Sequence, residues 1–155
     1  MEKNPESMGN VRKLLIDADA FVALNDKEDS NYQKAIKISE FITISKVTLF
    51  TSDPAFGEAI TVISENVGLK KAVEFAEEVL RSKIEIIEVE SRLRRDALEI
   101  FKRQKSKNTR FTDCVNIAIL ENEGLKEIFS FDSDYKKNGI LRIGVDTSTD
   151  SAKVD

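Results

Sequence analysis

A short apolar run that stops at an acid, Leu14 to Ile16 followed by Asp17, constrains the fold of this chain more than any other feature. Three apolar residues are too few for a helix of their own, and they are typical of a strand buried on both faces of a parallel sheet. Ligands of open α/β sheets lie outside the carboxyl ends of the strands. Asp17 is therefore either an acid at a functional edge of the sheet or an ordinary turn or helix-capping residue.

Composition narrows the chemistry that this chain can perform. Its 155 residues favour a single domain, and they include no His and one Cys, Cys114. The lack of His excludes a Ser-His-Asp triad and any His-liganded zinc site. One cysteine excludes an intramolecular disulfide, and we interpret Cys114 as a small core residue. Any metal must be bound by oxygen ligands, which favours Mg²⁺ or Mn²⁺.

The expected organisation is one folded unit, residues 11–145, between two polar ends. Residues 1–10 are polar and contain a Pro and a Gly, which predicts a flexible leader. Residues 146–155 are rich in Ser, Thr and Asp, which predicts a disordered tail. Because no stretch resembles a membrane span or a signal peptide, we expect a cytoplasmic protein.

Strand-like stretches alternate with helical periodicity along the chain. After the first strand, β-forming and apolar residues predict further strands over 47–51, 84–89, 128–131 and 140–143. Amphipathic segments lie between them. This alternation predicts an α/β fold with a mostly parallel sheet and right-handed crossovers.

Three further acids occupy positions comparable to that of the first. Asp132 directly follows the fourth predicted strand. Glu58 lies in an apolar row of the helix that we expect Ser52 to cap, and Asp113 begins the apolar row of a helix for which Thr112 is the expected N-cap. Taken singly, each is also explained as an acid at the edge of a stripe or in the first turn of a helix.

Together, these four acids could converge at one edge of the sheet. Carboxylates that lie close together repel one another, and protonation or a divalent cation relieves the repulsion. A cluster of this kind suits metal-assisted hydrolysis of a phosphodiester, in which one or two Mg²⁺ ions activate a water and offset the charge on the phosphate. The pattern therefore indicates a metal-dependent hydrolase.

The chain carries one basic segment, Arg92 to Arg110. It contains eight Lys and Arg against two acids, in a chain whose net charge is −4. A charged helix face is commonly no more than a solvated surface. The alternative is a surface that binds phosphates, for which we select five candidates by position: Arg95, Lys102, Arg103, Lys107 and Arg110.

The motifs around the four acids resemble those of PIN-domain nucleases, and most of all the VapC-type toxins of toxin–antitoxin pairs. The stretches that carry the likeness are LLIDADAF, FGEAITVI, RFTDCVNIAI and FSFDSDYKKNGI, in that order from about Leu14 to Ile143. The resemblance implies a PIN-like three-layer α/β/α fold with a mostly parallel central sheet of four to five strands. It also implies dependence on Mg²⁺ or Mn²⁺, endonucleolytic cleavage of single-stranded RNA, a homodimer and an antitoxin partner.

The resemblance also assigns roles to individual residues. Asp17, Glu58 and Asp113 match the metal-binding acids of the family, and Asp132 matches the fourth acid, with Asp134 as a neighbour that could assist. Thr112 matches a supporting hydroxyl residue beside the third acid. The family usually has Ser, Thr or Asn two residues after the first acid, whereas this chain has Asp19. Asp19 could join the metal site, alter its metal preference or cap the following helix.

Two other functions remain open at this point. The spacing of Asp17 and Asp19 after a strand is also similar to that of haloacid-dehalogenase-type phosphatases, although Phe21 stands where that family has Thr or Val. A PIN-like domain that binds RNA or protein without cleaving is the other alternative. The positions of Glu58 and Asp113 relative to Asp17 discriminate between these interpretations.

Overall fold

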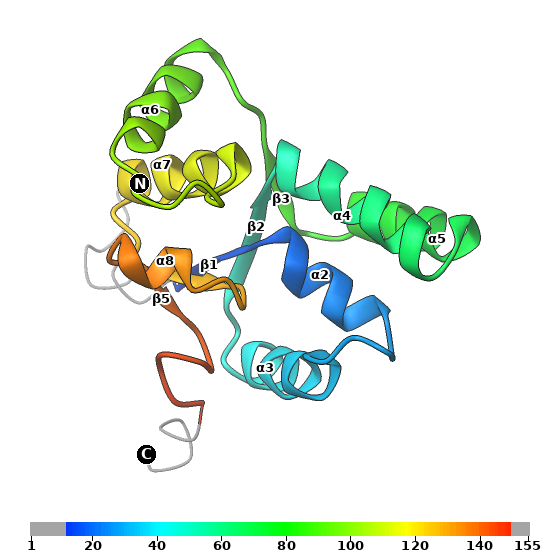
Figure 1. The fold of residues 1–155 in the computed structure, drawn as a ribbon. Coiled ribbons are helices and arrows are strands. Elements are labelled where there is room, and N and C mark those ends of the chain that lie inside the picture. The colour runs from blue at the N-terminus through cyan, green and yellow to red at the C-terminus, as the bar shows by residue number, and fades with distance from the viewer. Residues whose placement is uncertain (1–11, 150–155) are drawn as a thin grey trace, which may run out of the picture.

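The structure, a computed structural model, describes residues 12–149 and shows a five-stranded parallel sheet with helices on both faces (Figure 1). The elements in chain order are β1 Lys13–Ile16, α2 Ala18–Asn25, α3 Tyr32–Ile44, β2 Thr48–Ser52, α4 Asp53–Asn66, α5 Leu69–Arg81, β3 Glu85–Ile87, α6 Ser91–Lys102, α7 Phe111–Glu123, β4 Glu127–Phe129, α8 Asp134–Lys137 and β5 Leu141–Arg142. The predicted leader, 1–10, lies outside the described residues, as does the part of the predicted tail after residue 149. No helix between residues 12 and 149 is long and apolar enough to cross a membrane.

The strand order β3-β2-β1-β4-β5 places β1 at the centre of the sheet. Leu14 aligns with Leu49 of β2, and Leu15 aligns with Ile128 of β4, so β1 has a parallel neighbour on each side. The chain proceeds from β1 to β2 and β3 in one direction and adds β4 and β5 on the other side. This reversal creates a crevice beyond the carboxyl ends of β1 and β4, where open α/β sheets bind ligands.

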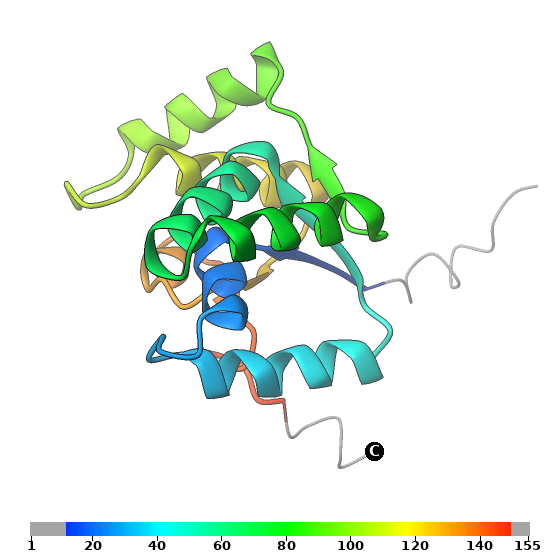
Figure 2. The ribbon, with the colours of Figure 1, turned by 90° about the vertical axis from the view of Figure 1, so that its right-hand side faces the viewer.

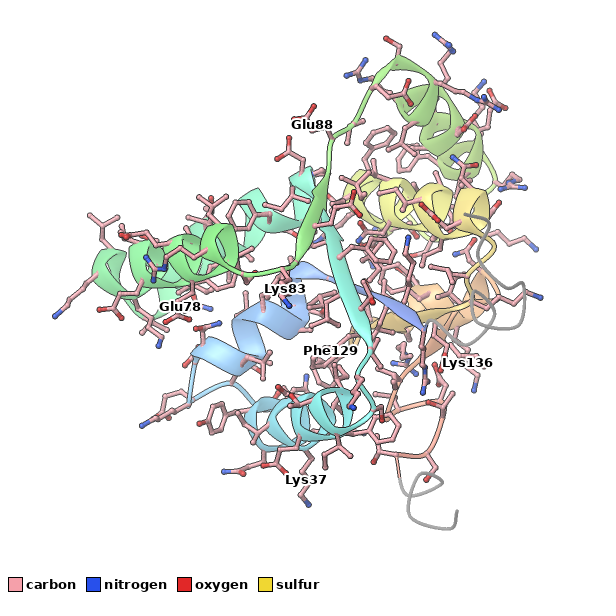
Figure 3. All side chains as sticks on the ribbon, turned by 180° about the vertical axis from the view of Figure 1, so that it is seen from behind. Lys37, Glu78, Lys83, Glu88, Phe129 and Lys136 are labelled. Carbon is pink, nitrogen blue, oxygen red and sulfur yellow. The ribbon has the colours of Figure 1, made fainter. Side chains whose placement is uncertain are left out.

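Two apolar cores, one on each face of the sheet, produce the three layers. Leu14 and Ile16 of β1 point into the core under α2, α3, α4 and α5, while Leu15 points into the core under α6, α7 and α8. In Figure 2 the view is onto α4 and α5, which cover the first face. Figure 3 shows Phe129 in the interior and the charged side chains of Lys37 and Glu78 at the periphery. Burial of β1 on both faces explains its unbroken apolar sequence.

Several element ends differ from the sequence prediction for identifiable reasons. Strand β4 ends at Phe129 rather than 131, because Ser130 and the residues after it turn into the site. We also expected from the sequence that Ser91 would cap α6, but the N-cap is Glu90, whose carboxylate accepts hydrogen bonds from the N–H groups of Arg92 and Leu93 at 3.0 and 2.7 Å. Helix α8 was not predicted, because four residues are too few to show periodicity.

Helix α7 begins one residue before Thr112, so the expected N-cap at Thr112 is wrong. The N-cap is Arg110, whose backbone N–H donates to the Asp113 side chain at 3.2 Å. This contact is half of a capping box and uses the acid three residues into the helix. It fixes the Asp113 carboxylate at the start of α7, next to the carboxyl end of β1.

Candidate functional site

A cleft of about 480 Å³, which we call the acidic cleft, opens at the carboxyl ends of β1 and β4. Seven acids line it: Asp17, Asp19, Asp29, Glu58, Asp113, Asp132 and Asp134. One cation, Arg110, lines it with them. The four acids singled out from the sequence thus lie in one cleft, which is the arrangement that the nuclease interpretation requires.

Asp17 lies deepest in the acidic cleft and is 4% exposed. Its Oδ1 atom accepts hydrogen bonds from the Ala18 N–H at 2.8 Å and from the Asn116 side-chain amide at 3.0 Å. Its Oδ2 atom accepts from the Tyr135 hydroxyl at 2.9 Å and the Ser130 hydroxyl at 3.1 Å. Every one of these donors is uncharged, so the carboxylate is fixed in place without a compensating positive charge.

Tyr135, a fully buried residue of α8, links the two buried acids. Its hydroxyl oxygen lies 2.9 Å from Asp17 Oδ2 and 3.2 Å from Asp113 Oδ1, and it accepts from the Asn116 amide at 2.9 Å. A phenol has one proton to donate and two lone pairs that accept. Both carboxyl contacts are therefore satisfied together only when one of the two carboxyl groups carries a proton of its own.

The second acid after β1, Asp19, is bonded on one oxygen only. Its Oδ2 atom accepts from the Phe131 N–H at 2.8 Å and lies 3.1 Å from the Ser130 hydroxyl. Its Oδ1 atom is buried and has no hydrogen-bond partner within the described residues. A buried carboxylate oxygen without a donor is costly, and a cation or a water is the usual compensation. Asp19 therefore contributes a free oxygen to the acidic cleft.

Three acids come closest to forming a metal site. Asp113, Asp132 and Asp134 each present an oxygen within 4.8 Å of the other two. The turn after β4 fixes this arrangement, because Asp132 Oδ1 accepts from the Asp134 N–H at 2.9 Å and the Asp132 N–H donates to the Ser130 hydroxyl at 3.1 Å. Oxygen ligands at this separation suit a hard divalent cation.

The pKa values of the buried acids are raised by burial, and no cation among residues 12–149 forms an ion pair with them to offset it. Burial, and next the charge of Asp19, raises the pKa of Asp17 to about 7. Burial, and next the charges of Asp17 and Asp132, raises the pKa of Asp113 to about 7. Burial raises the pKa of Asp19 to about 6. At neutral pH the acidic cleft therefore retains protons that a divalent cation would displace.

Glu58 lies at the mouth of the acidic cleft and is the one of the four principal predicted acids, Asp17, Glu58, Asp113 and Asp132, that has a cationic partner among residues 12–149. Arg110 Nη1 donates to Glu58 Oε1 at 2.9 Å, and this pairing raises the pKa of Arg110. The Arg110 side chain is 69% exposed, whereas that of Glu58 is 29% exposed. The sequence placed Arg110 among the phosphate-binding cations and did not predict that it would pair with a predicted metal ligand.

The remaining predicted residues lie outside the acidic cleft. Thr112 is half-buried in the first turn of α7, and its hydroxyl makes no hydrogen bond to any residue between 12 and 149. Lys102 pairs with Glu99 at 3.0 Å, and Arg103 lies 3.8 Å from Glu121. The two other predicted cations, Arg95 and Lys107, are exposed.

Three site residues were missed by sequence reasoning: Ser130, Asn116 and Tyr135. Asn116 left a signal, since it is a polar residue inside the apolar run of α7 and one turn after Asp113. Ser130 left a weaker one, as a polar residue between two phenylalanines at the end of β4. Tyr135 left none, because only the fold shows that its hydroxyl lies between Asp17 and Asp113.

The residues present fit a divalent cation. The acidic cleft is lined by seven carboxylates, and three of them, Asp113, Asp132 and Asp134, present oxygens mutually within 4.8 Å. Asp19, whose Oδ1 atom has no hydrogen-bond partner among residues 12–149, lines the same cleft. Hard oxygen donors with excess negative charge favour Mg²⁺ or Mn²⁺ over zinc or copper.

Comparison with known proteins gives a consistent result. Residues 14–141 match the sequence profile of the PIN domain. Two relatives, both described as 23S rRNA-specific endonuclease VapC20 and both from strains of Mycobacterium tuberculosis, are 22% identical over 130 residues, which is 84% of this chain and 97% of theirs. A crystal structure of VapC20 from the same organism, described as a toxin that cleaves the sarcin-ricin loop, superimposes with a TM-score of 0.75 and covers 84% of this chain and 98% of that one. The predicted PIN-like three-layer fold is confirmed.

Proposed function

This chain belongs to the PIN domain family, and we propose that it is a divalent-metal-dependent endoribonuclease that hydrolyses phosphodiester bonds in single-stranded RNA. The observation that carries the proposal is the presence of Asp17, Glu58, Asp113 and Asp132 in one cleft. The names of the VapC20 relatives support RNA as the substrate. The VapC20 of the crystal structure is described as a toxin, which supports the role of a toxin in a toxin–antitoxin pair for this chain.

Asp113, Asp132 and Asp134 are the residues that would bind the cation, with Asp17 and Asp19 completing the negative charge around it. A bound Mg²⁺ or Mn²⁺ would supply activation of a water and neutralisation of the phosphate's developing charge. The protein's own contribution is positional. Tyr135 and Asn116 fix the two buried carboxylates, so that the site is organised before the substrate arrives.

Arg110, at the mouth of the acidic cleft, is the residue that would bind the substrate's phosphate. Its guanidinium is mostly exposed and can leave Glu58 for a phosphate oxygen of the substrate, to which it can donate two parallel hydrogen bonds. Glu58 would then be free to face the cation. An exchange of this type lets a polyanion approach a cleft of seven acids without adding unpaired charge.

The phosphatase alternative is not favoured. It requires the Asp17 carboxylate to attack the substrate, yet both oxygens of Asp17 accept two hydrogen bonds each in a buried position. A nucleophile needs one accessible oxygen with a free lone pair. The non-cleaving alternative is decided by the assay that follows.

The test is RNA cleavage by the full chain in Mg²⁺, with matched reactions in EDTA and with Asp113→Asn in Mg²⁺. The proposal expects internal cleavage products that disappear with EDTA and with the variant. Equal cleavage in EDTA would contradict metal dependence. RNA binding without cleavage by the wild-type chain in either Mg²⁺ or Mn²⁺ would favour the non-cleaving alternative.

The homodimer and the antitoxin partner remain predictions from the resemblance. Helix α5 gives them some support, because Leu69, Val73 and Leu80 are apolar yet 72%, 46% and 66% exposed. An exposed apolar stripe on an amphipathic helix is typical of a protein contact. Light scattering of the purified chain tests the homodimer, with Leu69→Glu and Leu80→Glu expected to shift any dimer to a monomer.

A further inference from the structure

A second cleft, which we call the basic cleft, lies between the loop that follows α6 and helix α8. Its volume is about 520 Å³, and three cations line it, Arg103, Lys105 and Lys137, against one carboxylate, Asp134. The other lining side chains are neutral amides and hydroxyls. Its charge is thus opposite to that of the acidic cleft, where seven acids surround one cation. A concentration of cations and neutral donors suits a phosphate group.

The two clefts share a wall. Asp134 lines both of them, and the Thr109 hydroxyl, which lines the basic cleft, lies 3.4 Å from Asp134 Oδ2. The neighbours of Thr109 in the loop, Asn108 and Arg110, line the acidic cleft instead. A segment of this loop therefore separates the clefts, and a chain molecule that leaves the acidic cleft past Asp134 enters the basic one.

The basic cleft is built on a fixed base. The side-chain amides of Gln104 and Asn138 donate to each other at 2.9 and 3.1 Å. The remaining protons of those amides go to backbone carbonyls, Gln104 to Ile100 at 3.0 Å and Asn138 to Asp134 at 2.9 Å. This reciprocal amide pair connects the residues that follow α6 to those that follow α8, and so fixes the positions of Arg103 and Lys137 relative to each other. Because all the N–H groups of this amide pair already donate within the protein, a bound phosphate would be held mainly by the cations.

Two of the three cations of the basic cleft, Lys105 and Lys137, are largely available to a ligand, whereas Arg103 also lies 3.8 Å from Glu121 and lines the cleft between α6 and α7. Lys105 is exposed and makes no ion pair within residues 12–149, and Lys137 has only an exposed contact with Asp134 at 3.3 Å. By contrast, Lys102 is paired with Glu99. The cleft between α6 and α7 that Lys102 lines has three cations and three acids, so it presents no net charge.

We propose that the basic cleft binds a backbone phosphate of the RNA adjacent to the scissile one, through Arg103, Lys105 and Lys137. The inference rests on the proposed function and narrows it. The five cations selected from the sequence include Arg103 but neither Lys105 nor Lys137. Lys137 lies far away in the chain and is brought to the same cleft by α8. A phosphate bound there would position the backbone without reading its sequence.

The test is binding of a short fluorescein-labelled single-stranded RNA by the full-length Asp17→Asn protein in Mg²⁺, across a series of salt concentrations. In this background we compare Lys105→Gln, Lys137→Gln and Arg103→Gln with matched controls that leave the basic cleft intact, Arg95→Gln, Lys102→Gln and Lys136→Gln. Log affinity falls as log salt rises. Replacing a cation that contacts a phosphate should make this fall shallower, by roughly 0.7 in slope, the value per contact for a single strand. The controls should keep the parental slope, and all six should melt at the parental temperature.

Two outcomes would overturn the inference in different ways. If the wild-type chain cleaves RNA but the three cleft variants keep the parental slope, or change it no more than the controls do, the basic cleft is not the binding site and the proposed nuclease function stands. If the wild-type chain neither binds nor cleaves RNA, the proposed function and this inference fail together.

Discussion

The side chains of Asp17 and Asp146 both lie out of contact with most of the solvent, yet their pKa values move in opposite directions. The side chain of Asp146 is 4% exposed and accepts three hydrogen bonds from Arg142, two from the guanidinium and one from the backbone N–H. Arg142 lowers the pKa of Asp146 to about 2. Asp17 is more deeply buried, its four donors are uncharged and its nearest charges are other acids, so burial raises its pKa to about 7.

The difference shows that this protein supplies a cation to a buried acid where structure alone is at stake. It does not supply one to the buried acids at the carboxyl ends of β1 and β4, Asp17 and Asp113. There, neutral groups fix the carboxylates of Asp17 and Asp113, and the one guanidinium in the acidic cleft binds Glu58 at its mouth. An arrangement of this kind sacrifices stability in the absence of a ligand and is typical of a site completed by an external cation.

The largest expected effect, a loss of cleavage, comes from neutralising Asp17, with the neutralisation of Asp146 as its control. Asp17→Asn should lower RNA cleavage by more than about 100-fold and raise the melting temperature in EDTA. The new amide fits, because its oxygen accepts from Ala18 and Asn116, and its NH₂ donates to the Tyr135 and Ser130 hydroxyls, which can turn toward Asp113 and Asp19. Thermal melts in EDTA and a cleavage assay in Mg²⁺ measure the two effects.

Asp146→Asn is the matched control for that variant. It removes the carboxylate charge that faces the Arg142 guanidinium, which keeps its hydrogen bond to the Phe131 carbonyl, and should cost roughly 1–3 kcal/mol of unfolding free energy. Its cleavage activity per folded molecule should be unchanged. The comparison breaks if both variants shift the melting temperature in the same direction, or if Asp17→Asn cleaves at the wild-type rate.

Asn116→Asp adds a carboxylate next to the buried acid Asp17 and one turn after Asp113, where a further negative charge should be least tolerated. Asn116 is fully buried and donates to both Asp17 and Tyr135. The variant replaces those donors with an acceptor and should cost roughly 3 kcal/mol or more at neutral pH, with much of the loss recovered in acid. Asn122→Asp, on the same helix, is the control: its only side-chain hydrogen bond among residues 12–149 is an exposed one to Asp96 at 3.4 Å, so solvent screens the added charge and the cost should be below about 1 kcal/mol. Denaturant titration of both variants decides, and equal effects would contradict the account.

The contrast between these two regions also marks what sequence could and could not predict. Asp17, Glu58, Asp113 and Asp132 were visible because each interrupts an apolar pattern or ends a strand. Local pattern also predicted the order of strands and helices, since burial of β1 on both faces leaves a distinct signal.

What the sequence could not show depends on contacts between distant elements. Tyr135 reaches Asp17 across 118 positions, and Asn116 reaches it across 99. Asp146 resembled the start of a polar tail, because its partner Arg142 and its burial are set by the turn after β5. The pairing of Glu58 with Arg110 likewise follows from the approach of α4 to α7.

The pH dependence of stability sharpens the comparison. Asp17 and Asp113 have pKa values of about 7 in the folded protein, and the unfolded value is near 3.9. Between those values the folded protein binds more protons, so the free energy of unfolding falls as pH rises. In EDTA the wild-type chain should therefore melt several degrees lower at about pH 8 than at about pH 5. Asp17→Asn should reduce that difference, and a melting temperature that rises toward pH 8 in EDTA would contradict the shifted pKa values.

The smallest expected effect tests the neutral donors. Tyr135→Phe removes the hydroxyl that connects Asp17, Asp113 and Asn116, and should cost about 1–2 kcal/mol. Cleavage should slow by roughly 10-fold, because the carboxylates lose their orientation. Tyr32→Phe, at the start of α3 and outside the lining of the acidic cleft, is the control and should change neither quantity. Identical behaviour of the two variants would remove Tyr135 from the site.

Calorimetric titration of the metal-free chain with Mn²⁺ at neutral pH, in two buffers with different ionisation enthalpies, tests the central claim most directly. The account predicts that Mn²⁺ binds and releases protons from the acidic cleft, that Asp17→Asn weakens binding and releases fewer protons, and that Asp146→Asn matches the wild type. Absence of binding, or binding in Asp17→Asn with the wild-type affinity and proton release, would contradict it.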